Sequence, residues 1–137
     1  MVTMAELLKE AERARPHSGP YKDEEHRIQC ACVRWFRYQY PMFRRLLFAV
    51  PNGGARSKAT AGKLKAEGVV AGVSDLILLV GRGSYKGLCI EMKRPKGTQS
   101  AEQKAWQRDV EQEGYLYIIC RSFDDFVQKV GEYLSKK

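Results

Sequence analysis

No stretch of the sequence is a long, uninterrupted apolar run. The first residues, MVTMAELLKEAERAR, alternate charged and apolar side chains, so the apolar centre of a secretory signal peptide is missing. Later apolar runs stay well below the roughly 20 residues that a membrane-spanning helix needs. We therefore expect a soluble protein of the cytoplasm that makes no contact with a membrane.

The sequence also lacks a C-x-x-C pair. Its four cysteines, Cys30, Cys32, Cys89 and Cys120, all lie within apolar patterns. Together with the missing signal peptide, this placement favours reduced, buried thiols over disulfides. A zinc site containing His26, Cys30 and Cys32 is an alternative, because His26 and Cys30 are one helical turn apart, but a tetrahedral site needs a fourth ligand.

Acidic residues are scarce relative to basic ones. The chain has 16 Asp and Glu against 24 Lys and Arg, a formal net charge of +8. Such an excess attracts polyanions, either nucleic acid or an acidic membrane face, and says nothing about the fold. The 137 residues suffice for one domain with a substantial apolar core. We expect residues 1–20 to form an N-terminal helix and lead-in, and residues 21–137 to form a single domain.

Hydrophobic periodicity and turn residues predict the order of helices and strands. The second helix is expected to begin with Asp23 as its N-cap, and Ser100 with Gln103 three residues later forms a capping box. A Gly-rich segment joins the two central apolar runs, as in an antiparallel hairpin. The pattern predicts an α/β fold with a mixed central sheet flanked by helices. Helices are expected at 1–15, 23–40, 58–68, 100–114 and from 122 to the lysine tail, and buried strands at 45–50, 75–80, 87–93 and 115–120.

Three charged residues lie at one end of the expected hairpin. Glu91 and Lys93 are two residues apart in a strand, so their side chains point to the same face of the sheet. An antiparallel register places Asp75, at the start of the first strand, opposite the end of the second. Two carboxylates that close together repel each other unless a cation lies between them, and oxygen ligands suit Mg²⁺ or Mn²⁺. The alternative is an exposed strand-end acid beside an ordinary Glu91–Lys93 surface pair.

Five short motifs resemble those of one nuclease family. The E-x-x-x-Q of a helix is EHRIQ, the Asn-Gly loop is PNGGAR, and G-x-x-x-G-x-x-D is GVVAGVSD. The E-x-K motif is EMK, and a Ser-to-Gln helix followed by Gly-Tyr is SAEQKAWQRDVEQEGY. In these motifs the chain resembles, from about Glu24 onward, the VRR-NUC nucleases, a branch of the PD-(D/E)xK superfamily of metal-dependent phosphodiesterases. One position departs: Ser74 stands where the superfamily name has proline, which shapes the backbone and supplies no ligand.

The resemblance implies a restriction-endonuclease-like core and a metal site. Asp75 and Glu91 are expected to bind Mg²⁺ or Mn²⁺, with help from the backbone carbonyl of Met92 and from Glu25. The helix that carries Glu25 can lean over the end of the hairpin and bring this third carboxylate close. Its neighbour Glu24 suits the role less well, because it is in register with the apolar stripe of the helix. A position on the solvent-facing helix surface is the alternative for Glu25.

The resemblance also implies roles for a lysine and two glutamines. Lys93 is expected to contact the attacking water and the scissile phosphate, either as general base or only as an electrostatic contact. Gln29 lies one helical turn after Glu25, and Gln29 and Gln103 are expected to orient water or phosphate by hydrogen bonding. For Gln103 the capping box is an equally good explanation.

Basic and amide side chains cluster around these motifs. Contacts of this kind to phosphates give a salt-dependent affinity that tolerates many base sequences. They suit recognition of the shape of a nucleic acid. The expected nucleic-acid-binding residues are Asn52, Arg56, Lys58, Lys63, Lys65, Arg82, Lys86, Arg94, Lys96 and Gln103.

The resemblance therefore implies a metal-dependent, structure-specific DNA endonuclease that acts on branched DNA, at a four-way junction or a flap. A homodimer would supply a second active site, and the apolar residues of the N-terminal helix would either serve that interface or pack on their own domain. No small-molecule cofactor is expected. Two alternatives stay open: a non-catalytic nucleic-acid-binding module that uses the same basic surface, and a nuclease directed at RNA.

Overall fold

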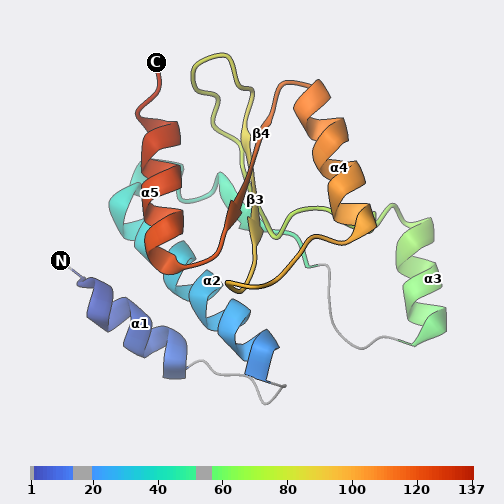
Figure 1. Cartoon of the computed structure of the whole chain (residues 1–137), viewed down its shortest axis with the longest axis horizontal. Coiled ribbons are helices and arrows are strands. Elements are labelled where there is room, and N and C mark those ends of the chain that lie inside the picture. The colour runs from blue at the N-terminus through green and yellow to red at the C-terminus, as the bar shows by residue number, and fades with distance from the viewer. Residues whose placement is uncertain (1, 14–19, 52–56) are drawn as a thin grey trace.

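The fold is an α/β arrangement around one mixed sheet (Figure 1). The computed structural model of the chain describes residues 2–13, 20–51 and 57–137. The predicted order of helices and strands is confirmed, and a 3-10 turn at Pro41–Phe43 is added to it. The described elements are α1 (Met4–Arg13), α2 (Pro20–Gln39), η1 (Pro41–Phe43), β1 (Leu47–Ala49), α3 (Lys58–Ala66), β2 (Leu76–Leu78), β3 (Leu88–Met92), α4 (Ala101–Gln112), β4 (Leu116–Cys120) and α5 (Phe123–Leu134).

The four strands lie in the order β1-β2-β3-β4. β1 and β2 pair antiparallel, and β2 and β3 form the predicted antiparallel hairpin. β4 is parallel to β3, and α4 makes the crossover between them. Figure 1 shows α4 on one side of the sheet and α2 and α5 on the other. The predicted mixed sheet flanked by helices is therefore confirmed.

The apolar core lies between the sheet and the α2–α5 layer. Phe36 of α2 and Phe126 of α5 are fully buried in it, and all five residues of β3 are buried. Trp35 packs edge-on against Phe126, with ring centroids 6.1 Å apart. Leu7 of α1 belongs to the same cluster, so α1 packs on its own domain through this side chain. Each such buried apolar side chain contributes about 1.5–3 kcal/mol.

Two expectations about element ends were wrong. α2 begins at Pro20, so Asp23 lies inside the helix and is not its N-cap; proline fits the first helical position because the missing N–H has no helical partner there. The predicted buried strand at 45–50 shrinks to β1, which is an edge strand: Leu47 is buried, but Phe48 is 40% exposed. An edge strand has a sheet neighbour on one side only.

The four cysteines are free thiols, as expected. Cys32, Cys89 and Cys120 are buried, and burial raises the pKa of the Cys120 thiol to about 12. The zinc alternative finds little support: Cys30 Sγ lies 3.4 Å from His26 Nε2, but Cys32 is buried in the apolar core. Among the helices that the structure describes, none is long and apolar enough to cross a membrane.

Candidate active site

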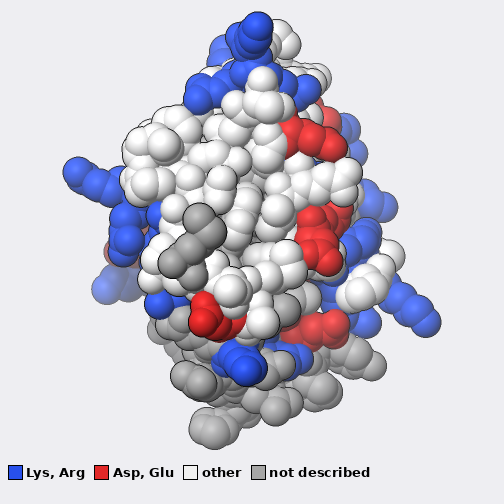
Figure 2. All heavy atoms as spheres, turned by 90° about the vertical axis from the view of Figure 1, so that its left-hand side faces the viewer, with Lys and Arg blue, Asp and Glu red and all other residues white. Residues whose placement is uncertain are grey.

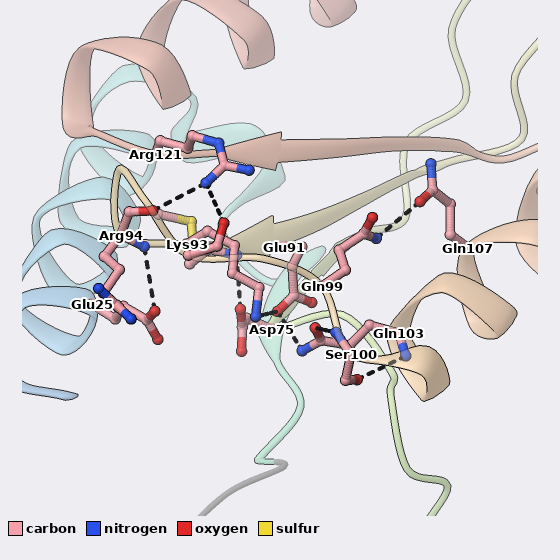
Figure 3. A network of polar contacts seen from close by, with 12 residues as sticks. Glu25, Asp75, Glu91, Lys93, Arg94, Gln99, Ser100, Gln103, Gln107 and Arg121 are labelled. Atoms are coloured by element: carbon pink, nitrogen blue, oxygen red, sulfur yellow. Dashed lines mark hydrogen bonds and ion pairs between the residues drawn. The ribbon is translucent and has the colours of Figure 1, made fainter. Parts of the chain in front are cut away.

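The hairpin register places two acids side by side. Leu76 of β2 pairs with Ile90 of β3, so Asp75, one residue before β2, lies opposite Glu91 of β3. The Asp75 carboxylate is held in place, because its Oδ2 accepts a hydrogen bond of 2.7 Å from the backbone N–H of Met92. The bond fixes the carboxylate beside β3 (Figure 3). The acids of the two strands therefore face each other by construction of the sheet.

Glu91 is the most buried acid of this end of the sheet, with 2% of its surface exposed. Its Oε1 accepts a hydrogen bond of 3.1 Å from Gln103 Nε2 and lies 3.9 Å from Lys93 Nζ (Figure 3). Its Oε2 is buried without a hydrogen-bond partner. Burial, and then the neighbouring charge of Asp75, raise the pKa of the Glu91 carboxyl to about 9, while Lys93 lowers it. Because Oε2 lacks a hydrogen bond, ionising this carboxyl in the buried site is unfavourable.

Gln103 serves both roles that the sequence left open. Its side-chain Oε1 accepts a hydrogen bond from the backbone N–H of Ser100, and its backbone N–H donates to the Ser100 hydroxyl oxygen, which completes the capping box at the start of α4. The capping box does not use the side-chain Nε2, which donates a hydrogen bond to Glu91. The helix cap therefore holds the amide in place against the buried carboxylate.

The segment before Asp75 packs tightly on the first turn of α4. Gly72 has a φ of +91°, and a Cβ added to it would collide with the carbonyl oxygen of Glu102 and lie 2.8 Å from the amide nitrogen of Gln103. Only glycine fits both the conformation and the space. Ser74, at the position where the superfamily name has proline, is fully buried and donates a hydrogen bond of 3.1 Å to the carbonyl of Leu76. This bond shapes the turn that leads into β2.

Glu25 reaches the same end of the sheet from α2. Its Oε1 accepts a hydrogen bond of 3.3 Å from the backbone N–H of Arg94, directly after Lys93 (Figure 3). Gln29 lies one helical turn further along and is half-buried. Within the described parts of the chain, no three His, Cys, Asp or Glu side chains converge into a metal site, so Asp75 and Glu91 form a pair without Glu25 as a third carboxylate.

Arg121 is a residue of this region that the sequence analysis missed. It follows β4, and one guanidinium nitrogen, Nη1, donates to three carbonyls of the segment after Lys93: those of Arg94 at 3.1 Å, Pro95 at 3.2 Å and Gly97 at 2.7 Å. Since β3 and β4 are parallel and Met92 pairs with Cys120, the two strands end at the same edge of the sheet. The sequence analysis could not identify Arg121, because it predicted the strand at 115–120 without predicting which strand it pairs with.

Comparisons with known proteins identify the family of the chain. The sequence profile of the VRR-NUC domain matches residues 21–124, about three quarters of the chain. The chain belongs to the VRR-NUC domain family. A solved structure described as a VRR_NUC domain protein is 26% identical, with a TM-score of 0.71 over 85% of this chain and 90% of that one. No curated protein matches the sequence significantly. The chain is thus a domain of a nuclease family, and its fold is the one that the structural relative has.

The wall of the site in this VRR-NUC domain continues along α4 and β4. Gln99 Nε2 donates to Gln107 Oε1 at 2.9 Å and to the Tyr117 hydroxyl at 3.2 Å. Burial, followed by the charge of Glu91, raises the pKa of the Tyr117 hydroxyl. Tyr117 therefore stays neutral beside the acids, as a hydrogen-bonding group and not as an anion.

The expected nucleic-acid-binding residues fall into separate places. Lys58, Lys63 and Lys65 are exposed on α3, and Lys96 is exposed in the segment after Lys93. Arg82 and Lys86 lie at the tip of the hairpin, the opposite end of the strands from the acids, and Arg82 is held there by the carbonyl of Leu134 and the ring of Phe43. Asn52 and Arg56 lie outside the described residues. The structure therefore brings Gln103 to Glu91 and the backbone of Arg94 to Glu25, and leaves Arg82 and Lys86 away from the acids.

Replacing Arg121 by alanine should slow DNA cleavage about 10- to 100-fold. The segment that follows Lys93 loses its three hydrogen bonds to the guanidinium group, so Lys93 is no longer held in a fixed position. The measurement is single-turnover cleavage with saturating DNA, which separates the chemical step from binding. We expect the loss in kcat and not in KM, with partial rescue by added guanidinium ion. A variant that melts earlier but cuts at the normal rate would show that Arg121 serves stability alone.

Proposed function

We propose that this VRR-NUC domain is a Mg²⁺- or Mn²⁺-dependent endonuclease that hydrolyses phosphodiester bonds of branched DNA. The observation that carries the proposal is the pair Asp75 and Glu91, with one buried Glu91 oxygen that lacks a hydrogen-bond partner, next to Lys93. A buried carboxyl beside a second acid is costly to ionise, and such pairs are typical of places where a cation binds.

The donors at this place fit a hard divalent cation. Mg²⁺ takes one or two carboxylates from the protein and completes its octahedron with waters and substrate phosphate oxygens. Asp75 and Glu91 supply those carboxylates, and the carbonyl of Met92, the residue between Glu91 and Lys93, is the further oxygen we assign. When bound, the ion supplies Lewis-acid stabilisation of the phosphate and makes a bound water easier to deprotonate. Glu25, whose Oε1 accepts the N–H of Arg94, would be a further carboxylate of the metal site.

The remaining groups position the substrate. Lys93 is half-buried and close to Glu91, so its ammonium is available to the scissile phosphate at the edge of the site. There it stabilises the charge that develops on the non-bridging oxygens. Gln103, fixed by its helix cap, keeps the Glu91 carboxylate in one orientation. Glu25 and Arg121 hold the segment of Arg94 from opposite sides, which restricts the motion of Lys93.

A homodimer is the second part of the proposal. Two copies would supply two active sites, which suits paired cuts across a four-way junction. Figure 2 shows a broad surface with few charged side chains on the side of the molecule that carries α1 and α5. Met4 of α1 is 47% exposed, so this helix offers apolar surface beyond the part that packs on its own domain. Light scattering coupled to size exclusion, beside the pattern of nicks, tests this assembly.

The activity is tested with end-labelled four-way junction, flap and linear duplex DNA, and with matched RNA. Each is incubated with the protein in Mg²⁺, in Mn²⁺ and in chelator. We expect cutting of the branched DNAs with either metal, none in chelator, and a loss of at least about 100-fold in Lys93→Ala, because a charge that stabilises the transition state is removed.

Two results would change the proposal. Binding of every DNA without cutting under any metal would make the domain a non-catalytic nucleic-acid-binding module. Faster cutting of the RNA substrates would make RNA the target. The Lys104→Ala variant is the control for a lost lysine, because Lys104 is exposed on α4 and has no assigned role at the acids.

A further inference from the structure

α3 stands apart from the rest of the described structure (Figure 1). None of its residues is buried, and it makes no extended packing contact with another described helix or strand. The Ser57 hydroxyl caps its first turn by accepting the N–H of Thr60 at 3.1 Å. A helix of nine residues is marginal in water on its own, since most helical stability comes from packing of one face. α3 thus has a surface that its own domain does not cover.

The charge of α3 is of one sign. Its lysines, Lys58, Lys63 and Lys65, are all exposed, and no acid occurs before Glu67 at the C-cap. Mid-helix Gly62 has only open space where a Cβ would stand, so no packing contact within the described structure requires its small size. Such a helix complements a polyanion that approaches closely.

The end of α3 exposes an apolar pair. Gly68, with a φ of +106°, donates its N–H to Lys65 O at 3.1 Å, and the N–H of Val69 donates to Leu64 O at 3.0 Å. This pair of bonds is a Schellman motif, which ends the helix and turns the chain. Val69 is 41% and Val70 is 55% exposed on this turn. Exposed β-branched side chains next to a run of lysines indicate a surface that meets both charge and apolar groups.

The turn is tied to the active site. Gly72, two residues after Val70, contacts the backbone of Glu102 and Gln103, and Gln103 binds Glu91. Four residues lie between Val70 and Asp75, so at most about 17 Å of extended chain joins the two. The turn therefore lies close enough to the acids to contact a nucleic acid bound there.

We propose that α3 and the turn after it, residues 58–70, form an arm that grips DNA at a branch point. The lysines bind phosphates of one duplex arm, and Val69 with Val70 packs against the base left unstacked where the strands separate. The inference rests on the proposed nuclease function and adds the part of the substrate that the domain senses. In a duplex without a branch the lysines can still bind phosphates, but every base is stacked, so the valines find no exposed base to pack against.

The test measures DNA binding by fluorescence anisotropy in chelator, so that no DNA is cut. A labelled flap and a linear duplex of equal length are titrated with wild type, with Lys63→Gln/Lys65→Gln, and with Val69→Ser/Val70→Ser. Matched controls are Lys136→Gln/Lys137→Gln, exposed lysines at the other end of the molecule, and Met42→Ser, an exposed apolar residue of η1.

The lysine variant should weaken binding of both DNAs and reduce the slope of log K against log salt by about 1 for each lysine removed. The valine variant should weaken flap binding about fivefold or more and leave duplex binding within twofold. Circular dichroism and thermal melting confirm that both variants keep the fold.

Three results would overturn the arm. The first is an unchanged flap affinity in both variants, and the second is a loss no larger than that of the control variants. The third is that the variants lose binding to anionic phospholipid vesicles while their DNA binding stays intact. A wild type that cuts the flap while the variants bind it normally defeats the arm alone. A wild type that neither binds nor cuts any nucleic acid defeats the proposed function first.

Discussion

Glu91→Gln should give a folded protein that cuts DNA at least about 100-fold more slowly and yet is more stable than the wild type in chelator. The activity falls because the amide is a poor ligand for a divalent cation. The stability rises because the variant removes a buried acid that faces Asp75 and has one oxygen without a hydrogen-bond partner. The measurements are cleavage of a flap substrate in Mg²⁺ and thermal unfolding with and without the metal.

The stability difference should depend on pH with a definite sign. The pKa of Glu91 is raised from 4.5 to about 9 by folding, so between these values the folded wild type holds a proton that the unfolded chain releases. Wild-type stability in chelator therefore falls as pH rises through this window, by up to about 1.4 kcal/mol per pH unit. The glutamine variant lacks this slope, so the two proteins converge toward pH 4.5 and separate toward pH 9.

Two controls make the result specific. Glu102→Gln removes an exposed acid in the first turn of α4 and should change neither the pH slope nor the cutting. Added Mg²⁺ should raise the stability of the wild type and not that of Glu91→Gln. Cleavage within a factor of two of wild type would remove Glu91 from the reaction, and a stability difference that stays constant from pH 5 to pH 8.5 would contradict its raised pKa.

Gly72→Ala should destabilise the domain by about 2–5 kcal/mol, the sum of a strained positive φ and an overpacked contact. The added methyl group meets the backbone of Glu102 and Gln103, which cannot yield as a flexible side chain can. Whatever fraction folds should also cut more slowly, because a shift of Gln103 removes a hydrogen bond from Glu91. Chemical denaturation and single-turnover cleavage at low temperature measure the two effects separately.

Gly62→Ala is the matched control for this substitution. Gly62 lies in the middle of α3, and a Cβ there meets nothing within 4 Å. Alanine should therefore leave the stability unchanged or raise it by about 0.5–1 kcal/mol, through better helix propensity. Equal effects of the two substitutions on the denaturation midpoint would mean that the segment before Asp75 does not pack on α4 as described.

The sequence predicts the hairpin and its acids well, because local rules decide both. The two continuous apolar runs and the Gly-rich segment between them predict the hairpin, and its antiparallel register places Asp75 opposite Glu91. The capping box of Ser100 and Gln103 is also local, and it is present in the structure. The sequence left open whether Gln103 caps the helix or contributes to the site. Its side chain does both, because the amide oxygen accepts from Ser100 while the amide nitrogen donates to Glu91.

The parts that the sequence did not predict depend on contacts between distant segments. Arg121 meets carbonyls 24 to 27 residues earlier in the chain, and no periodicity signals such a bond. The contact of Glu25 spans 69 residues, which is why its helix could be placed near the hairpin but its hydrogen-bond partner could not be named. Asp23 shows the opposite error, because a good local cap signal was overridden by the earlier start of α2 at Pro20.

The bonds of Arg121 also bear on the order in which the site is assembled during synthesis. When the ribosome has synthesised the hairpin, Asp75, Glu91 and Lys93 are already in the chain, but β4 and Arg121 are not. Until β4 has inserted beside β3, the backbone carbonyls after Lys93 lack their common donor. A nascent chain would therefore carry the acids and the lysine for some time without their final arrangement, and cutting activity would begin with the docking of the last strand.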